Sequence, residues 1–168
     1  MPDLFTADDL AGLPGAPFDN TNGNVTQASE AIRNALGWHL APSVEETLTV
    51  DSPGGVNVYL KSKYLTDVSE VRDVTAGTVL TGWTFSRLGR VTRRSGWPCD
   101  HLLEFDVTHG YAECPAELLP VGAAIARSGS SSSNVLKART AGPFREEYAD
   151  GFSQSQMAVL DPYKILFF

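Results

Sequence analysis

The sequence has few of the features that signal disulfide-stabilised folds, membrane spans or secretion. It contains two cysteines among 168 residues, so we expect two free, partly buried thiols in a reducing compartment rather than a disulfide framework. No hydrophobic run approaches the roughly 20 residues that cross a bilayer. The N-terminal stretch lacks a basic region ahead of an apolar one, so we expect no signal peptide and synthesis in the cytosol.

Basic residues and catalytic motifs are also scarce. The formal net charge is −7, from 13 Lys and Arg against 20 Asp and Glu, whereas a free-standing nucleic-acid-binding protein would be basic overall. The sequence contains no G-x-S-x-G, no H-E-x-x-H and no phosphate-binding glycine loop. We therefore expect no enzyme activity and no cofactor, and a hydrolase with an unrecognised site stays open as a further alternative.

Cys99, His101, His109 and Cys114 form the one cluster of residue types that could bind zinc. Their spacings do not match a zinc finger, which needs a close cysteine pair and a separate histidine pair. Cys99 and His101 would lie on the same side of a strand, which keeps a site with two cysteines and two histidines open. We interpret the four as structural residues near turns and predict no metal.

Two helices are predicted, one on each side of a β-rich middle. Asn24 is a suitable N-cap for a helix over 25–36, and Gly37 is suited to end it. A second helix is expected over 116–127, because Pro115 is tolerated in a first helical turn.

The middle of the chain has the alternation and the turn signals of short strands. Apolar and polar residues alternate over 102–108, which predicts a half-buried strand with Phe105 facing inward. The Ser-Pro-Gly-Gly sequence at 52–55 predicts a turn, and Gly96 and Pro98 are expected to break any element that enters from upstream. Several such strands suggest a small antiparallel sheet or barrel.

The predicted fold class is α+β, with helices at both ends of the core packed on a small antiparallel β-sheet or barrel and an extended C-terminal arm. Residues 1–127 are expected to form the core domain, 128–134 a flexible Ser-rich linker and 135–168 the arm. A single core is expected to join both helices to the strand through the side chains of Ile32, Trp38, Trp97, Phe105 and Leu118.

Four short motifs carry a family resemblance. They are L-P-G-A-P-F at 13–18, G-W-H-L-A-P at 37–42, T-H-G-Y at 108–111 followed by P-A-E-L at 115–118, and G-P-F with E-Y-A within 142–149. In this pattern the chain resembles the head-to-tail connector (adaptor) proteins of long-tailed bacteriophages, over nearly its whole length. The Ser-rich segment and the apolar C-terminus depart from the family pattern.

The resemblance implies a structural virion protein that is made in the host cytoplasm. Such adaptors form a dodecameric ring beneath the portal protein and extend the DNA channel towards the stopper and the tail. The implied partners are other copies of the chain, the portal and a stopper or tail-completion protein, with non-specific contact to packaged DNA and no membrane. The alternative is a head-closure (stopper) or tail-completion protein of the same neck.

One basic concentration stands out against the acidic composition: Arg87, Arg90, Arg93 and Arg94. These arginines either belong to a solvated hairpin or form a rim of positive charge in a ring. Such a rim would face DNA phosphates or an acidic partner surface.

The C-terminus, which ends in I-L-F-F, is too apolar for a free solvated end. It either folds back onto its own core or docks in a partner's groove. The resemblance implies that the C-terminal segment clasps the portal, so we expect residues 152–168 to be disordered or collapsed in the isolated subunit. The predicted partner-binding residues are Phe152, Leu160, Tyr163, Ile165, Leu166, Phe167 and Phe168.

Overall fold

The computed structural model describes residues 1–14, 24–130, 138–141, 144–147 and 152–165. The chain divides into two compact units. Residues 38–112 form one unit, here called the sheet unit, and residues 1–37 with 113–168 form the other, here called the helical unit. Among the helices of the described residues, none is long and apolar enough to cross a membrane.

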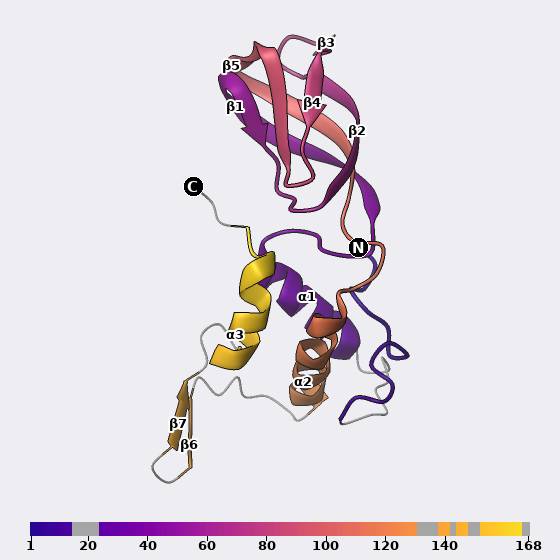
Figure 1. Cartoon of the computed structure of the whole chain (residues 1–168), viewed down its shortest axis with the longest axis vertical. Helices are drawn as coiled ribbons and strands as arrows, with labels where there is room; N and C mark the ends of the chain where they lie inside the picture. The colour runs from indigo at the N-terminus through magenta and orange to yellow at the C-terminus, as the bar shows by residue number, and fades with distance from the viewer. Residues whose placement is uncertain (15–23, 131–137, 142–143, 148–151, 166–168) are drawn as a thin grey trace. The chain divides into compact units, whose positions relative to one another are not determined.

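The sheet unit is one open antiparallel sheet (Figure 1). The strand order is β1-β5-β2-β3, and β4 also pairs with β5. The predicted α+β class and small antiparallel sheet are confirmed, and the sheet is not closed into a barrel. Its strands are β1 (Val44–Tyr59), β2 (Leu65–Asp73), β3 (Thr78–Val79), β4 (Trp83–Phe85) and β5 (Arg90–His109).

Strand β5 organises the sheet because it pairs with three other strands. Its C-terminal half lies between β1 and β2, so that His109 is opposite both Val44 and Leu65. Its N-terminal half lies between β1 and β4, so that Val91 is opposite Val58 and Phe85. The predicted alternation over 102–108 is confirmed, since Leu103, Phe105 and Val107 are buried and the polar residues that alternate with them are more exposed.

The turn predicted at 52–55 and the break predicted at Gly96 and Pro98 are both wrong. The two stretches lie opposite each other in the β1–β5 pair, with Gly55 facing Trp97, and the register shifts on both sides of them. Gly55 and Gly96 have φ of +76° and +83°. Bulges accommodate residues with positive φ and prolines, which have no N–H to donate. The two strands therefore bend together and neither ends.

The core of the sheet unit lies on the inner face of β5. Phe105 is fully buried, and Trp97 lies edge-on to it with 5.5 Å between ring centroids. The indole nitrogen of Trp97 donates to the carbonyl oxygen of Val56 at 3.1 Å. The other buried members are Val58, Leu60, Leu65, Val68, Val71, Val91, Leu103 and Val107.

The helical unit contains both predicted helices. They are α1 (Asn24–Leu36), and η1 (Ala116–Leu118) continued by α2 (Leu119–Ser130). Helix α2 therefore extends three residues into the segment expected to be a linker. The rest of the unit holds the hairpin β6 (Ala138–Ala141) and β7 (Phe144–Glu147), then α3 (Gln154–Leu160) and η2 (Asp161–Tyr163).

The N-terminal segment packs on the helices of the same unit. Leu4 donates its backbone N–H to the buried hydroxyl of Ser29 on α1 at 3.0 Å. The buried ring of Phe5 lies so close to Gly122 that a Cβ at that position would be 2.4 Å from Cζ of Phe5. Glycine in α2 therefore makes room for this ring.

The prediction of a single core is wrong. Trp97 and Phe105 belong to the core of the sheet unit, whereas Ile32 and Leu118 are buried residues of the helical unit. Trp38 is a sheet-unit residue that packs against Tyr111. Alternation and helical periodicity show which face of an element is buried, but they do not show which other element covers it.

Candidate functional site

Two motifs that carry the family resemblance meet at one end of the sheet unit. The backbone N–H of Tyr111, at the end of T-H-G-Y, donates to the carbonyl oxygen of Leu40 in G-W-H-L-A-P at 2.7 Å. Tyr111 also stacks on Tyr64 with 4.2 Å between ring centroids, and the centroids of the Trp38 and Tyr111 rings are 6.4 Å apart. The two motifs therefore form one structural junction.

Gly110 and the motif histidines explain why this junction needs its particular residues. Gly110 has φ of +94°, and a Cβ there would lie 3.1 Å from the carbonyl oxygen of Leu40. The imidazole of His109, which is 1% exposed, pairs through Nε2 with a carboxylate oxygen of Glu46 at 3.1 Å. His39 lies edge-on to His109 at 5.8 Å. The histidines thus hold the junction together.

The structure distributes the four candidate zinc ligands among separate contacts. His101 pairs with Asp73 at 2.7 Å, whereas His109 pairs with Glu46. Cys99 is exposed on β5, and Cys114 belongs to the helical unit. Within the described residues, no group of three or more His, Cys, Asp and Glu side chains is arranged to hold a metal ion.

The local environments of Asp73 and Cys114 shift the pKa values of the two side chains in opposite directions. Burial alone would raise the pKa of Asp73, but hydrogen bonds from the Ala76 N–H and from His101 hold that pKa below its ordinary value. Burial raises the pKa of the Cys114 thiol to about 12, so this thiol has little nucleophilic character at neutral pH.

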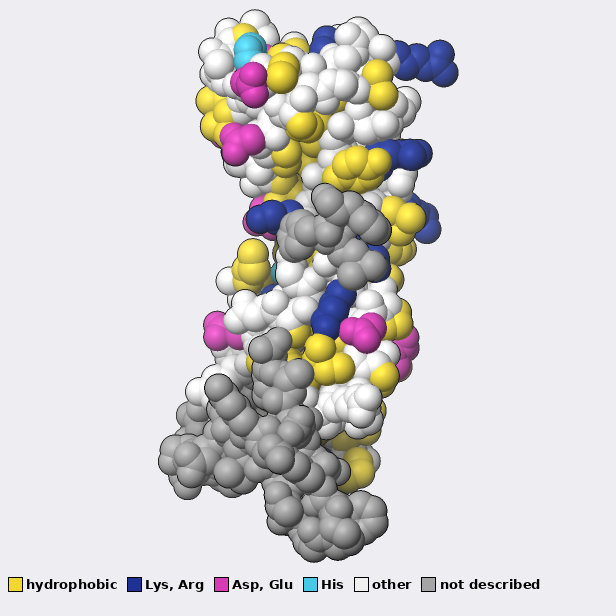
Figure 2. Space-filling model, turned by 90° about the vertical axis from the view of Figure 1, so that its left-hand side faces the viewer, with side chains coloured by type: hydrophobic (Ala, Val, Ile, Leu, Met, Phe, Trp, Pro, Cys, Tyr) yellow, Lys and Arg dark blue, Asp and Glu magenta, His cyan; other side chains and the backbone are white. Residues whose placement is uncertain are grey.

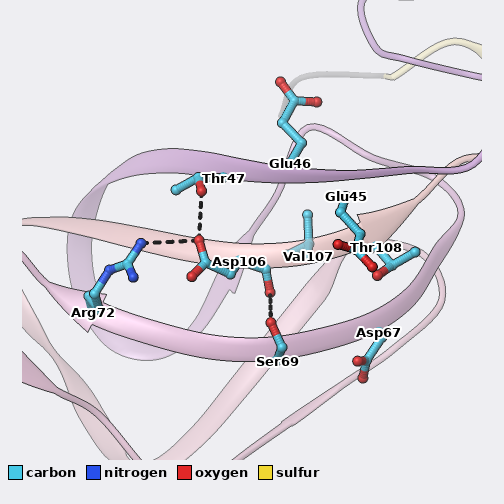
Figure 3. A pocket seen from close by; sticks show the side chains of 9 residues that line it. All are labelled: Glu45, Glu46, Thr47, Asp67, Ser69, Arg72, Asp106, Val107 and Thr108. Atoms are coloured by element: carbon cyan, nitrogen blue, oxygen red, sulfur yellow. Dashed lines mark hydrogen bonds and ion pairs between the residues drawn. The ribbon is translucent and has the colours of Figure 1, made fainter.

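The outer face of the sheet carries a hollow surrounded by acidic side chains (Figure 3). Arg72 lies among them and forms ion pairs with Glu70 at 3.0 Å, Asp106 at 3.1 Å and Glu104 at 3.4 Å. The charge of Asp106, opposed by some desolvation, raises the pKa of Arg72 above its ordinary value. We call this surface the acidic face and define it by Glu45, Asp67, Glu70, Glu104 and Asp106 around Arg72.

Hydrogen bonds across three strands hold the acidic face in place. The carboxylate of Asp106 on β5 accepts from the hydroxyl of Thr47 on β1 at 2.6 Å. The hydroxyl of Ser69 on β2 donates to the backbone carbonyl of Asp106 at 3.1 Å, and both bonds are visible in Figure 3. Carboxylates at fixed positions on a sheet form a lasting negative surface.

The four predicted arginines are not equivalent. Arg93 is half-buried, lies over the Trp97 ring and donates to the backbone carbonyls of Thr81 and Gly96 at 3.1 and 2.7 Å. It therefore supports the sheet itself. The other three are exposed, although Arg87 also lies over the ring of Tyr64 at 5.6 Å.

Exposed apolar side chains accompany the exposed arginines. Leu88 is 70% exposed at the β4–β5 turn, and Tyr59 is 68% exposed directly opposite Arg90 in the sheet. Figure 2 shows hydrophobic side chains beside Lys and Arg side chains at one margin of the sheet unit. We call this surface the basic edge and define it by Tyr59, Arg87, Leu88, Arg90 and Arg94.

The turn of the basic edge is fixed in the sheet unit. Gly89 has φ of +81°, and a Cβ there would lie 2.2 Å from the carbonyl oxygen of Ser62. The backbone N–H of Leu65 donates to the carbonyl of Arg87, and that of Leu60 donates to the carbonyl of Gly89, both at 2.8 Å. Leu88 is therefore presented on an ordered turn.

The predicted partner-binding residues of the C-terminal arm lie partly inside the helical unit. Phe152 and Leu160 are buried, at 5% and 0% exposure. The hydroxyl of Tyr163 donates to Glu117, and the backbone N–H of Ile165 donates to the carbonyl of Leu36 at 3.2 Å. The expected roles of Leu166, Phe167 and Phe168 lie outside the described residues.

Residues 152–165 thus differ from the expected disordered or collapsed segment. Ser153 begins α3 with a capping box, in which its hydroxyl accepts from the Gln156 N–H and the Gln156 side chain accepts from the Ser153 N–H. Leu160 then buries itself at the end of this short helix. The binding role of these residues stays a prediction. In that role, Phe152 and Leu160 would have to leave their buried positions.

Sequence reasoning missed the acidic face. Its residues alternate with buried ones along β1 and β5, and such alternation is equally typical of a solvated surface opposite a buried one. The available signal was the run of acidic residues at outward positions on neighbouring strands, opposed by a single arginine.

Comparison with known proteins gives a similar fold among solved structures. No family model matches the chain, and no curated protein matches it significantly. Among solved structures, a chain in "Neck of empty GTA particle computed with C6 symmetry" has a similar fold, with a TM-score of 0.63 and 17% sequence identity. The match covers 96% of this chain and 87% of that chain. The structural neighbour thus belongs to the neck of a gene transfer agent, a phage-like particle.

Proposed function

We propose that this chain is a structural protein of a phage neck, namely the head-to-tail adaptor that forms a ring between the portal and the stopper or tail. The observation that carries the proposal is the similarity to a neck chain over 96% of the sequence. The family motifs, recognised independently in the sequence, support the same assignment. Twelve subunits, the number implied by the resemblance, would be compatible with the sixfold symmetry applied to the neighbour's particle.

The described surfaces suit assembly better than catalysis. The motif residues at the junction hold backbone segments together, as Gly110 and Tyr111 do with the segment around Leu40. The prominent solvent-facing features of the sheet unit are a charged face and an edge with exposed apolar side chains. Exposed Leu and Tyr side chains beside arginines are typical of protein–protein interfaces.

In this proposal the C-terminal arm attaches the ring to the portal. The attachment would use Tyr163, Ile165 and the apolar end at 166–168, and the release of Phe152 and Leu160 would enlarge the contact. The exposed arginines of the basic edge would contact a neighbouring protein surface or the phosphates of packaged DNA.

Pairwise reconstitution with the portal, stopper and tail-tube proteins of the same genome tests this role. An adaptor binds the portal ring directly, without any other neck protein, and co-sediments with it. Deletion of residues 162–168 is expected to abolish that binding while leaving the thermal unfolding of the sheet unit unchanged. Binding only to a preformed portal–adaptor complex would identify a stopper instead, and binding only to tail tubes would identify a tail-completion protein.

A further inference from the structure

We propose that neighbouring copies in the ring join head to tail, with the basic edge of one copy docked on the acidic face of the next. This inference rests on the ring assembly of the proposed function and adds the surfaces that form it. Both surfaces belong to the sheet unit, so the distance between them is set within one compact unit. A contact between two different patches of identical subunits closes into a ring when the rotation between neighbouring copies is a full turn divided by a whole number.

The two surfaces are complementary in charge. The acidic face brings Glu45, Asp67, Glu70, Glu104 and Asp106 around the single cation Arg72. The ion pairs described within it all involve Arg72, which three of the carboxylates share. The basic edge supplies three exposed arginines. Complementary potentials of this kind guide association and fix which surfaces meet.

Among the described residues, no ion pair joins the two surfaces within one chain. Arg90 and Arg94 lie in the N-terminal part of β5, whereas Glu104 and Asp106 lie in its C-terminal part. The bulged segment that includes Gly96 and Asp100 lies between them. A second copy of the chain can bring the two charges together, and this copy is the occupant to which the proposal commits.

The basic edge has the composition and rigidity of a docking element. Leu88 and Tyr59 supply exposed apolar area among the arginines, as in an interface whose apolar centre has a charged rim. The close packing of Gly89 against Ser62 fixes the turn that carries Leu88. A surface that is already ordered loses little conformational entropy on binding.

Charge reversal followed by mixing tests the proposal. One variant, Arg90→Glu with Arg94→Glu, makes the edge acidic. Another, Glu45→Lys with Asp67→Lys, puts two lysines on the face, removes its net negative charge and keeps the three carboxylates that pair with Arg72. Each variant replaces the chain in a particle whose own gene is deleted, and the titre of functional particles is measured. Each alone is expected to lower the titre by about 100-fold or more, because the attraction between edge and face is lost in every subunit contact.

The mixture distinguishes direct contact from general damage. Copies with Glu at 90 and 94 can alternate with copies that have Lys at 45 and 67, so that opposite charges meet again in every contact. Co-expression of the two variants is therefore expected to restore the titre to within about tenfold of the wild type. The chain that carries all four substitutions is expected to recover in the same way. Failure of both to recover, with each protein folded by circular dichroism, overturns the proposal.

Two controls complete the experiment. Asp8→Lys with Glu30→Lys makes the same charge change on exposed residues of the helical unit, and it is expected to leave the titre unchanged; an equal loss would assign the effect to net charge and overturn the proposal. If a reversal variant does not fold, a double-mutant cycle uses neutral substitutions instead. It combines one double variant on the edge, Arg90→Gln with Arg94→Gln, and one on the face, Glu45→Gln with Asp67→Asn. Non-additive losses support the contact and additive losses contradict it. If deletion of the gene for this chain leaves the titre of functional particles unchanged, the proposed function itself is refuted.

Discussion

Phe105 is the largest fully buried side chain of the sheet unit. It is fully buried on β5 and lies edge-on to Trp97. Phe105→Ala is expected to lower the free energy of unfolding by about 3–5 kcal/mol, because it removes an aromatic ring from a closed core. Guanidinium unfolding followed by tryptophan fluorescence measures the loss. Phe85→Ala, which removes a ring that is 37% exposed, serves as the control, and an equal loss in both variants would contradict the described core.

Gly89 is required by its backbone angle and by its surroundings together. Its φ is +81°, and a Cβ would lie 2.2 Å from the carbonyl oxygen of Ser62. Gly77 has a similar φ of +68°, but a Cβ at that position would have nothing within 4 Å. Gly77→Ala is expected to cost about 1–2 kcal/mol from the backbone angle alone, and Gly89→Ala clearly more. Equal urea midpoints for the two variants would show that the turn at Leu88 is not held against Ser62.

The strands show how far local sequence patterns reach. The alternation around Phe105 predicted the inner face of β5 correctly, because burial on one side of a sheet requires a period of two. The Gly and Pro signals at 52–55 and 96–98 predicted a turn and a break that the structure does not contain. Glycine and proline mark turns and bulges alike, and the difference depends on the strand opposite. Here each irregular stretch faces the other, which no local window contains.

The C-terminal helix shows a similar limit. The apolar end at 165–168 predicted that the C-terminal segment either folds back onto its own core or docks on a partner, and the sequence left this choice open. The structure buries Phe152 and Leu160 in the helical unit. The hydroxyl of Tyr163 and the backbone of Ile165 add hydrogen bonds to Glu117 and Leu36.

The docking of this helix is expected to depend on pH through Glu117. The hydrogen bond from Tyr163 holds the pKa of Glu117 below its ordinary value. A carboxyl whose pKa is lowered by folding stabilises the folded state above its unfolded pKa of about 4.3, and that stabilisation is lost as the pH falls through the folded pKa. Amide NMR shifts of α3 should therefore begin to change below about pH 4.

Two variants separate this bond from general acid effects. Glu117→Gln is expected to shift the α3 resonances already at neutral pH and to remove their acid transition, because a neutral acceptor forms a weaker bond with the tyrosine. Glu113→Gln, an exposed neighbour in the same unit, is expected to retain the wild-type profile. An acid transition that survives in Glu117→Gln would show that another group controls the docking of α3.

Division into two units is the feature of the whole chain that sequence reasoning did not anticipate. The five aromatic and aliphatic side chains assigned to one core are divided between the sheet unit and the helical unit. Each unit satisfies its own apolar periodicity, so local patterns agree with either arrangement. The functional surfaces are equally hard to read, because an acidic face that binds another protein has the same residue pattern as one that faces water.

Cryo-electron microscopy of the intact neck, from particles that carry this chain, tests its assignment as a neck protein most directly. We expect density for a closed ring of this chain between portal and tail. The sheet units of adjacent copies should be in contact through Arg90 and Arg94 on one side and Glu45 and Asp67 on the other. Particles that lack the chain, or that hold it outside the neck, would contradict the assignment.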